Sequence, residues 1–441
     1  MNAYQELFDR QKRHFATGAP RSRAWRVEQL DRMARLLAEN EVAFRKAIGQ
    51  DFKTASQEQI FETQACLVEV AFQKSQLDEW MKPVEAPVPR ALAATGHRGV
   101  VYRDPYGVVL IIGPFNGPLL LLLRPAIAAL AAGNCCVLKL SAAIKATSTL
   151  LMALVPKYFQ PEAVATVVGH KEETTEVLKL PFDFIFFTGS MSTGKVVARA
   201  AAENLTPVIL ELGGQNPALV DESANIKDAV MKIVWGAMAW GGQFCTSPGY
   251  AYVHESIAEE FVAESKSALI ELFGKDPKSN SDYSRIISAH EVSRLAGLID
   301  PKKVVIGGKS DPDARYLDPT IVYPVSWDEP IMEEEIFGPI LPILTYRTLD
   351  EALGRIAATP LPLAAFIFSR EQKTIDRFIG QLSPFGGIGP SGMGHYYGKH
   401  GFDMMTHAKS MLISPPDVAI DHLFPPYTSE KNADLKQWFE Y

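Results

Sequence analysis

The chain has 441 residues, of which 47% are hydrophobic, and a formal net charge of −7. A chain of this length and hydrophobic content can bury a large core, and we expect two or three domains. The charges are mixed and no basic run is dense, so nucleic acid is not an expected partner.

The four cysteines form neither a disulfide framework nor a CxxC pair, which favours a reducing, cytoplasmic location. His395 and His400 are five residues apart, a poor spacing for metal ligands, and we expect no metal site. The polar residues 1–13 predict no signal peptide. Residues 108–138 are strongly apolar, but the Gly/Pro-rich segment 113–118 interrupts them. This break argues against a membrane span and predicts a buried strand, a loop and a buried helix.

The first elements in chain order are predicted to be helical. Helical spacing of apolar residues spans 25–52 and again 61–80, and a proline-rich connector covers 83–89. An isolated strand is predicted near 99–103. Strands and helices then alternate, with strands at 108–112, 135–140, 164–168 and 182–187 and helices at 120–132 and 146–158.

A second cycle begins near residue 208, with strands at 217–220 and 250–253 and helices at 226–239 and 257–272. Continuous Val/Ile/Leu/Phe runs separated by helices are typical of parallel sheets covered on both faces. The predicted fold class is therefore α/β, with a doubly wound sheet.

Cys245, within Gly241-Gly-Gln-Phe-Cys-Thr-Ser-Pro248, is an unusual residue for a packed core, because two glycines and a glutamine precede it. Glu211 lies between two leucines and two glycines, where a lone buried carboxylate is costly to ionise. Together they indicate a nucleophilic thiol and a carboxylate base. Taken alone, a single cysteine is more often an inert buried side chain.

Three further segments carry weaker signals. Gly189 and Ser190 close an apolar strand and lead into a predicted helix, whose N-terminus can bind phosphate; a plain tight turn fits equally well. The spacing approaches a P-loop, but Val196 replaces the hydroxyl that would hold magnesium. Lys139, near the end of a strand, can bind ribose or phosphate, or lie at the surface. Asn116 between prolines is a candidate oxyanion donor or a turn residue.

In this order, the motifs resemble the aldehyde dehydrogenase superfamily, and in detail its class 3 branch. The resemblance covers nearly the whole chain. The matching stretches are Ile112-Gly-Pro-Phe-Asn116, Ala132-Gly-Asn-Cys-Cys-Val-Leu-Lys139, Phe187-Thr-Gly-Ser190, Leu205-Thr-Pro-Val-Ile-Leu-Glu-Leu-Gly-Gly214, Gly242-Gln-Phe-Cys245, Tyr316-Leu-Asp-Pro-Thr320, Glu335-Ile-Phe-Gly-Pro339, Pro384-Phe-Gly-Gly387 and Ser391-Gly-Met-Gly394.

The resemblance implies oxidation of an aldehyde to a carboxylic acid with NAD or NADP. Cys245 would attack the aldehyde carbon, Asn116 and the Cys245 N–H would hold the oxyanion, and Glu211 would activate water to hydrolyse the thioester. Glu335 would bind the nicotinamide-side ribose and Lys139 the adenine-side ribose. The remaining implied cofactor residues are Gly189, Ser190, Gly213, Phe115 and Phe337.

The resemblance also implies a cofactor domain at 1–210, a catalytic domain at 211–385, and a segment at 386–441 that returns to the cofactor domain. A small arm from 99–103 and the region near 410–413 would support a homodimer. The expected substrate is an aromatic or medium-chain aldehyde, in a pocket lined by Gly117, Trp235, Trp240 and Phe244.

Departures from the family pattern concern the pocket and the cofactor. Ala142 replaces a carboxylate that often binds the adenine ribose, so we expect tolerance of NADP. Gly117 replaces a tunnel aromatic, and Gln215 replaces a lysine. Between Leu382 and Ser383 a family segment of roughly twenty residues is missing, and it is either deleted from this protein or not included in the given sequence. Two alternatives stay open: a CoA-acylating aldehyde dehydrogenase, and a binding role of the same fold without catalysis. A P-loop nucleotidase is a third and more distant alternative.

Overall fold

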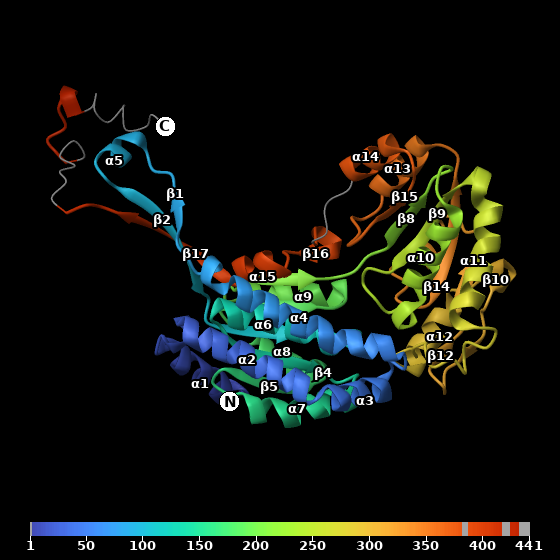
Figure 1. Cartoon of the computed structure of the whole chain (residues 1–441), viewed down its shortest axis with the longest axis horizontal. Helices are drawn as coiled ribbons and strands as arrows, with labels where there is room; N and C mark the ends of the chain where they lie inside the picture. Colours follow the sequence, from blue (N-terminus) through green and yellow to red (C-terminus); the bar gives the residue numbers. More distant parts are fainter. Residues whose placement is uncertain (1, 382–386, 417–423, 432–441) are drawn as a thin grey trace.

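A computed structural model describes residues 2–381, 387–416 and 424–431. It has two α/β lobes and a projecting arm (Figure 1). The junction between Leu382 and Ser383 lies outside the described residues. Within the described ranges, no helix is long and apolar enough to cross a membrane.

The first lobe is built on a six-stranded sheet with the order β16-β7-β6-β3-β4-β5. All pairs are parallel except β16 with β7. The strands are β3 (Val108–Ile112), β4 (Cys135–Ser141), β5 (Val164–Gly169), β6 (Phe184–Thr188), β7 (Val208–Glu211) and β16 (Gly392–Met393). The doubly wound α/β fold predicted from the apolar runs is confirmed.

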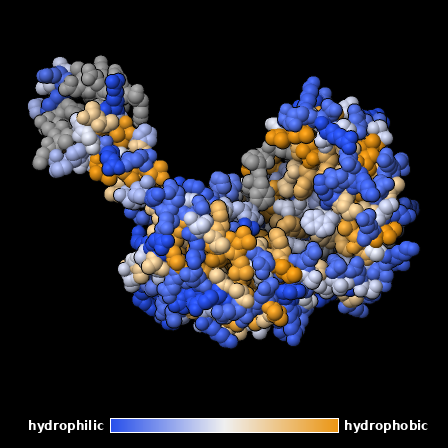
Figure 2. Space-filling model, viewed as in Figure 1, coloured by the Kyte–Doolittle hydropathy of each residue, from blue (hydrophilic) through white to orange (hydrophobic). Residues whose placement is uncertain are grey.

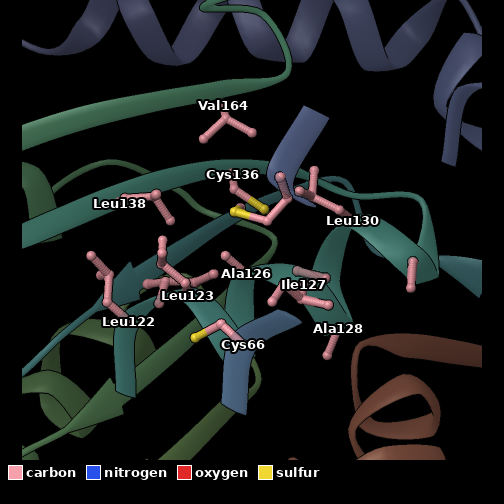
Figure 3. Close-up of a cluster of buried hydrophobic side chains, with 14 of the residues drawn as sticks. Cys66, Leu122, Leu123, Ala126, Ile127, Ala128, Leu130, Cys136, Leu138 and Val164 are labelled. Atoms are coloured by element: carbon pink, nitrogen blue, oxygen red, sulfur yellow. The ribbon is translucent and has the colours of Figure 1, made fainter. Parts of the chain in front are cut away.

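Helices cover both faces of this sheet. They are α1 (Gln5–Ala16), α2 (Arg23–Glu39), α3 (Glu41–Asp51), α4 (Ser56–Trp80), α6 (Leu120–Ala132), α7 (Lys145–Tyr158), α8 (Lys171–Leu178), α9 (Met191–Ala202) and α15 (Gly398–Met404). Helix α6 is apolar except for Arg124 and is almost entirely buried. It packs with Cys66 of α4 and Cys136 of β4 in the core shown in Figure 3. Burial raises the pKa of both thiols, as expected for inert core cysteines.

The second lobe has a sheet with the order β10-β13-β14-β9-β8-β15. Its strands are β8 (Asn216–Val220), β9 (Pro248–His254), β10 (Val304–Ile306), β13 (Thr320–Val322), β14 (Ile340–Tyr346) and β15 (Phe366–Phe368). The helices are α10 (Ile226–Met238), α11 (Ala258–Phe273), α12 (Ala289–Gly297), α13 (Leu349–Ala357) and α14 (Gln372–Gln381). A short hairpin joins β11 (Ser310–Asp311) to β12 (Tyr316–Leu317).

The arm is a three-stranded antiparallel sheet of β1 (Val84–Ala86), β2 (Arg98–Pro105) and β17 (Thr406–Ile413), with α5 (Arg90–Ala94). The strand predicted near 99–103 is therefore paired on both sides rather than isolated. The helix predicted over 25–52 is two helices, because the chain breaks at Asn40, which has φ −119°. The expected domain limit at residue 210 falls inside β7.

Candidate active site

Cys245 lies in a loop between the turn η2 (Ala239–Gly242) and β9, and it is partly exposed. Three residues of this turn have left-handed backbone, namely Trp240 (φ 58°), Gly241 (φ 64°) and Gly242 (φ 67°). A Cβ on Gly242 would lie 2.2 Å from the carbonyl oxygen of Gly338. Glycine is required there both by the backbone conformation and by this close approach.

The buried side chain of Gln243 fixes the turn η2 by hydrogen bonds. Its Nε2 donates to the carbonyl oxygens of Trp240 and Arg285, each at 3.0 Å, and its Oε1 accepts from the N–H of Ile287 at 2.9 Å. A buried amide with both ends bonded holds the backbone before Cys245 in one conformation.

Asn216, at the start of β8, holds the same loop from the other side. Its Nδ2 donates to the carbonyl oxygens of Cys245 (2.9 Å) and Ser247 (2.8 Å). Its Oδ1 accepts from the N–H of Ala364 at 2.8 Å. Sequence reasoning missed Asn216, because its role depends on contacts 29 and 148 residues away.

Glu211 lies at the carboxyl end of β7 and is 5% exposed. Its Oε1 is buried without a hydrogen-bond partner among the described residues. Burial raises the pKa of Glu211 to about 8. A carboxyl group with a pKa near neutrality is suited to accept a proton at physiological pH.

Burial raises the pKa of the Cys245 thiol to about 12, and the charges of Glu335 and Glu211 act in the same direction. Both carboxylates are therefore close enough to Cys245 to influence its ionisation. The thiol is protonated at neutral pH, so its attack on a carbonyl requires a group that takes the proton.

Asn116 lies in the loop between β3 and α6 and is 3% exposed. The ring of the preceding Phe115 contacts Phe52 and Phe337, each with centroids 5.9 Å apart. The Asn116 loop thus contacts the loop that carries Glu335. A Cβ on Gly117 would lie 2.6 Å from Cγ of Leu121, so a side chain there would displace a buried leucine.

The predicted cofactor residues of the first lobe gather at the carboxyl ends of its strands. Lys139 of β4 donates to the carbonyl oxygen of Gly169 at 2.7 Å. The Ser190 hydroxyl caps α9 and accepts from the Thr193 N–H at 3.4 Å. A Cβ on Gly189 would lie 2.6 Å from the Phe187 ring.

Glu335 belongs to the second lobe and reaches the carboxyl ends of the first-lobe strands. Its loop includes Phe337, whose φ is 51°. Loss of water contact raises the pKa of Glu335 to about 7, and the backbone N–H of Gly214 opposes this shift by hydrogen bonding. A Cβ on Gly213 would lie 2.2 Å from Glu335 Oε2.

These residues fit a dinucleotide. The open α/β sheet presents its crevice at the strand ends, a helix N-terminus is available for pyrophosphate, and a carboxylate is available for ribose hydroxyls. The hydroxyl of Thr188, at the carboxyl end of β6, is buried and has no hydrogen-bond partner among the described residues. It lies at the same edge of the sheet, where the strands end.

The rings of Trp240 and Phe244 are in contact, with centroids 4.2 Å apart and planes tilted by 58°, and the ring of Phe61 lies 6.1 Å from that of Trp240. Trp235, also predicted for the pocket, is 60% exposed on α10 and does not belong to this group of rings. Tyr397 was not predicted, yet the charges of Cys245 and Glu211 raise its pKa, after the larger effect of burial. Tyr397 therefore lies near both.

A sheet of the dinucleotide-binding type, with a loop cysteine and two carboxyl groups of raised pKa, fits a nicotinamide-dependent dehydrogenase. The chain belongs to the aldehyde dehydrogenase family, whose model matches residues 3–411. It is an aldehyde dehydrogenase that uses NAD or NADP.

It is 37% identical to 4,4'-diaponeurosporen-aldehyde dehydrogenase of Staphylococcus aureus, over 97% of each chain. It is also 37% identical to a dimeric NADP-preferring aldehyde dehydrogenase of Mus musculus, over 94% of this chain and 95% of that one. The solved structure of Staphylococcus aureus AldH in its substrate-bound state matches with a TM-score of 0.96 at 36% identity and covers all of both chains.

Proposed function

We propose that Cys245 is the nucleophile, Asn116 and the Cys245 N–H hold the oxyanion, and Glu211 is the base. The observation that carries this proposal is the juxtaposition of a loop cysteine with a buried carboxyl group whose pKa is about 8. No other described cysteine combines partial exposure with neighbouring carboxylates, since Cys66, Cys135 and Cys136 are buried.

In the proposed reaction, the Cys245 sulfur bonds to the aldehyde carbon and its proton passes to water, so that this step does not depend on Glu211. The carbonyl oxygen gains negative charge, which Asn116 and the Cys245 N–H stabilise by hydrogen bonds. The bound nicotinamide supplies hydride-accepting chemistry. Loss of hydride converts the thiohemiacetal to a thioester, and Glu211 takes a proton from the water that cleaves it, releasing the acid and the thiol.

Lys139, Ser190 and Glu335 would hold the cofactor, together with Gly189, Gly213, Phe115 and Phe337. Glu173 joins this group as a residue that sequence reasoning missed. Burial lowers the pKa of Lys139, and the Glu173 charge opposes that shift, so the two side chains are neighbours. Glu173 therefore supplies a carboxylate near Lys139, where Ala142 lacks one.

We propose an aromatic or medium-chain aldehyde as the substrate. A cavity of about 600 Å³ opens beside α4. Figure 2 shows hydrophobic residues on the face of the first lobe along which α4 runs. Phe61 belongs to this cavity and also contacts Trp240, which links it to the Cys245 loop. The lining residues are Phe61, Gln64, Ala65, Val68, Glu69, Phe72, Arg124 and Gly398.

We further propose a cytoplasmic homodimer that binds neither membrane nor nucleic acid. The support is the arm strand β17, on which Met411, Leu412 and Ile413 are 45%, 54% and 39% exposed. Apolar side chains on an exposed strand favour a partner surface. The Mus musculus relative named above is described as dimeric.

A panel of aromatic, short-chain and medium-chain aldehydes, assayed with NAD and with NADP by the absorbance of the reduced nicotinamide, tests the substrate proposal. We expect the highest kcat/KM for aromatic or medium-chain aldehydes. A preference for acetaldehyde would contradict the proposal. Adding CoA in place of water as acyl acceptor separates the hydrolytic reaction from the CoA-acylating alternative.

A further inference from the structure

Two fully buried side chains of opposite charge contact the loops that carry Asn116 and Cys245. Lys53 follows α3, Glu62 lies on α4, and neither side chain has any exposed surface. Lys53 Nζ forms an ion pair with Glu62 Oε1. A buried ion pair is weak evidence for stability, because apolar residues of similar volume often stabilise a fold equally well or better. The contacts of this pair suggest another role.

Glu62 holds the start of α6. Its Oε2 accepts from the backbone N–H groups of Leu119 at 3.0 Å and Leu120 at 2.8 Å. A carboxylate at a helix N-terminus binds free amides and complements the helix dipole. Leu119 is three residues after Asn116, so Glu62 anchors the loop that carries the proposed oxyanion donor.

Lys53 contacts the other loop. Its Nζ lies 3.4 Å from the centre of the Trp240 ring, within reach of a cation–π interaction. The backbone N–H of Trp240 donates to Glu58 Oε1 at 2.6 Å. Trp240 has the left-handed φ of 58°, which a bulky residue keeps only where its surroundings impose it. Its ring contacts that of Phe244, the residue before Cys245, with centroids 4.2 Å apart.

We propose that Lys53 and Glu62 are positioning residues of the dehydrogenase. Through Glu62 the pair fixes the Asn116 loop, and through Lys53 it fixes the loop of Cys245. The oxyanion donor and the nucleophile thereby keep one relative position. This inference rests on the proposed roles of Asn116 and Cys245. Misplacement of about 1 Å can cost on the order of a hundredfold in rate, so such a link has a functional consequence.

The test is a double variant, Lys53→Met with Glu62→Gln, which removes both charges and leaves an acceptor for the α6 amides. We expect kcat to fall by about tenfold or more, with KM for the aldehyde and Kd for NAD within about threefold of wild type. Alkylation of Cys245 by iodoacetamide should keep its rate, because that reaction needs no oxyanion donor.

Asp51→Asn is the matched control. The Asp51 carboxylate is also buried and also caps a helix, accepting from the N–H groups of Ala146 and Thr147 at 2.8 Å each. It binds the start of α7 instead of a catalytic loop. We expect the control to lower the melting temperature and to leave kcat within about twofold of wild type.

A folded double variant with kcat within about threefold of wild type would overturn the inference. So would an equal loss of kcat in Asp51→Asn, which would mark the effect as general destabilisation. If the double variant does not fold, Glu62→Gln alone is measured by the same criteria. Cys245→Ser distinguishes a failure of this inference from a failure of the proposed function. If it is inactive while the double variant is fully active, only this inference fails; if it is active, the proposed function fails.

Discussion

The carboxylate of Glu335 lies against the backbone of Gly213, so that a Cβ on Gly213 would come within 2.2 Å of Glu335 Oε2. The two residues belong to different lobes, since Gly213 follows β7 of the first sheet and Glu335 precedes β14 of the second. The absence of a side chain at Gly213 is thus what allows a carboxylate from the second lobe to reach the edge of the first lobe that we propose binds the cofactor.

Gly213→Ala should therefore weaken cofactor binding. Displacement of Glu335 removes the proposed ribose contact, and we expect Kd for NAD to rise about tenfold, or about 1.4 kcal/mol. Fluorescence titration measures this. Gly354→Ala is the control, because nothing lies within 4 Å of the Cβ it would add. An unchanged Kd in Gly213→Ala would show that Glu335 does not bind the cofactor.

The pKa of Glu211, about 8, predicts the pH dependence of turnover. A base accepts a proton only when it is ionised, so thioester hydrolysis should accelerate as pH rises through about 8. Steady-state kcat, measured with saturating substrates from about pH 6 to about pH 9, should follow this rise. Glu211→Gln should abolish the rise and leave a burst of reduced cofactor. A normal steady-state rate in that variant would exclude the role of Glu211 in activating water.

The same carboxyl group should limit stability at alkaline pH. Its folded pKa is raised above the ordinary value of 4.5, so its stabilising contribution is complete below about pH 4.5 and is lost as pH rises through about 8. Glu211→Gln removes this loss. Relative to wild type, we expect it to gain at least about 1.4 kcal/mol of unfolding free energy between about pH 5 and about pH 9, the equivalent of one pKa unit.

Urea unfolding at both pH values measures this difference. Glu203→Gln, at an exposed glutamate at the end of α9, is the control and should show no such dependence. An equal gain in both variants would mean that the burial of Glu211 is not its cause.

Cofactor choice should depend on the charges around Lys139. Ala142→Glu restores a carboxylate, which would repel a 2′-phosphate, and should lower the NADP/NAD ratio of kcat/KM about tenfold, or about 1.4 kcal/mol. Glu173→Gln should act in the opposite direction, because it removes the exposed carboxylate beside Lys139. Steady-state kinetics with both cofactors decide this. If neither substitution moves the ratio, these side chains do not select the cofactor.

Much of the fold could be predicted from the sequence because its signals are local. Strand 108–112 and helix 120–132 coincide with β3 and α6, since continuous apolar runs bounded by Gly and Pro have few alternatives. The break at Asn40 was missed because the apolar spacing continues across it.

At the site, the motif residues could be singled out, but their supports could not. Asn216 and Glu62 are ordinary residues in the sequence. Asn216 binds the carbonyl oxygen of Cys245, 29 residues away, and Glu62 binds the N–H of Leu119, 57 residues away. No periodicity encodes such contacts.

The most direct test of the proposed chemistry is to trap the acyl enzyme. Glu211→Gln is mixed with NAD and an aromatic aldehyde, and intact-protein mass spectrometry with peptide mapping follows. We predict that the mass increases by one acyl group, that the adduct maps to Cys245, and that hydroxylamine removes it, as expected for a thioester. An adduct on another residue, or a burst of reduced cofactor without any adduct, would contradict the account.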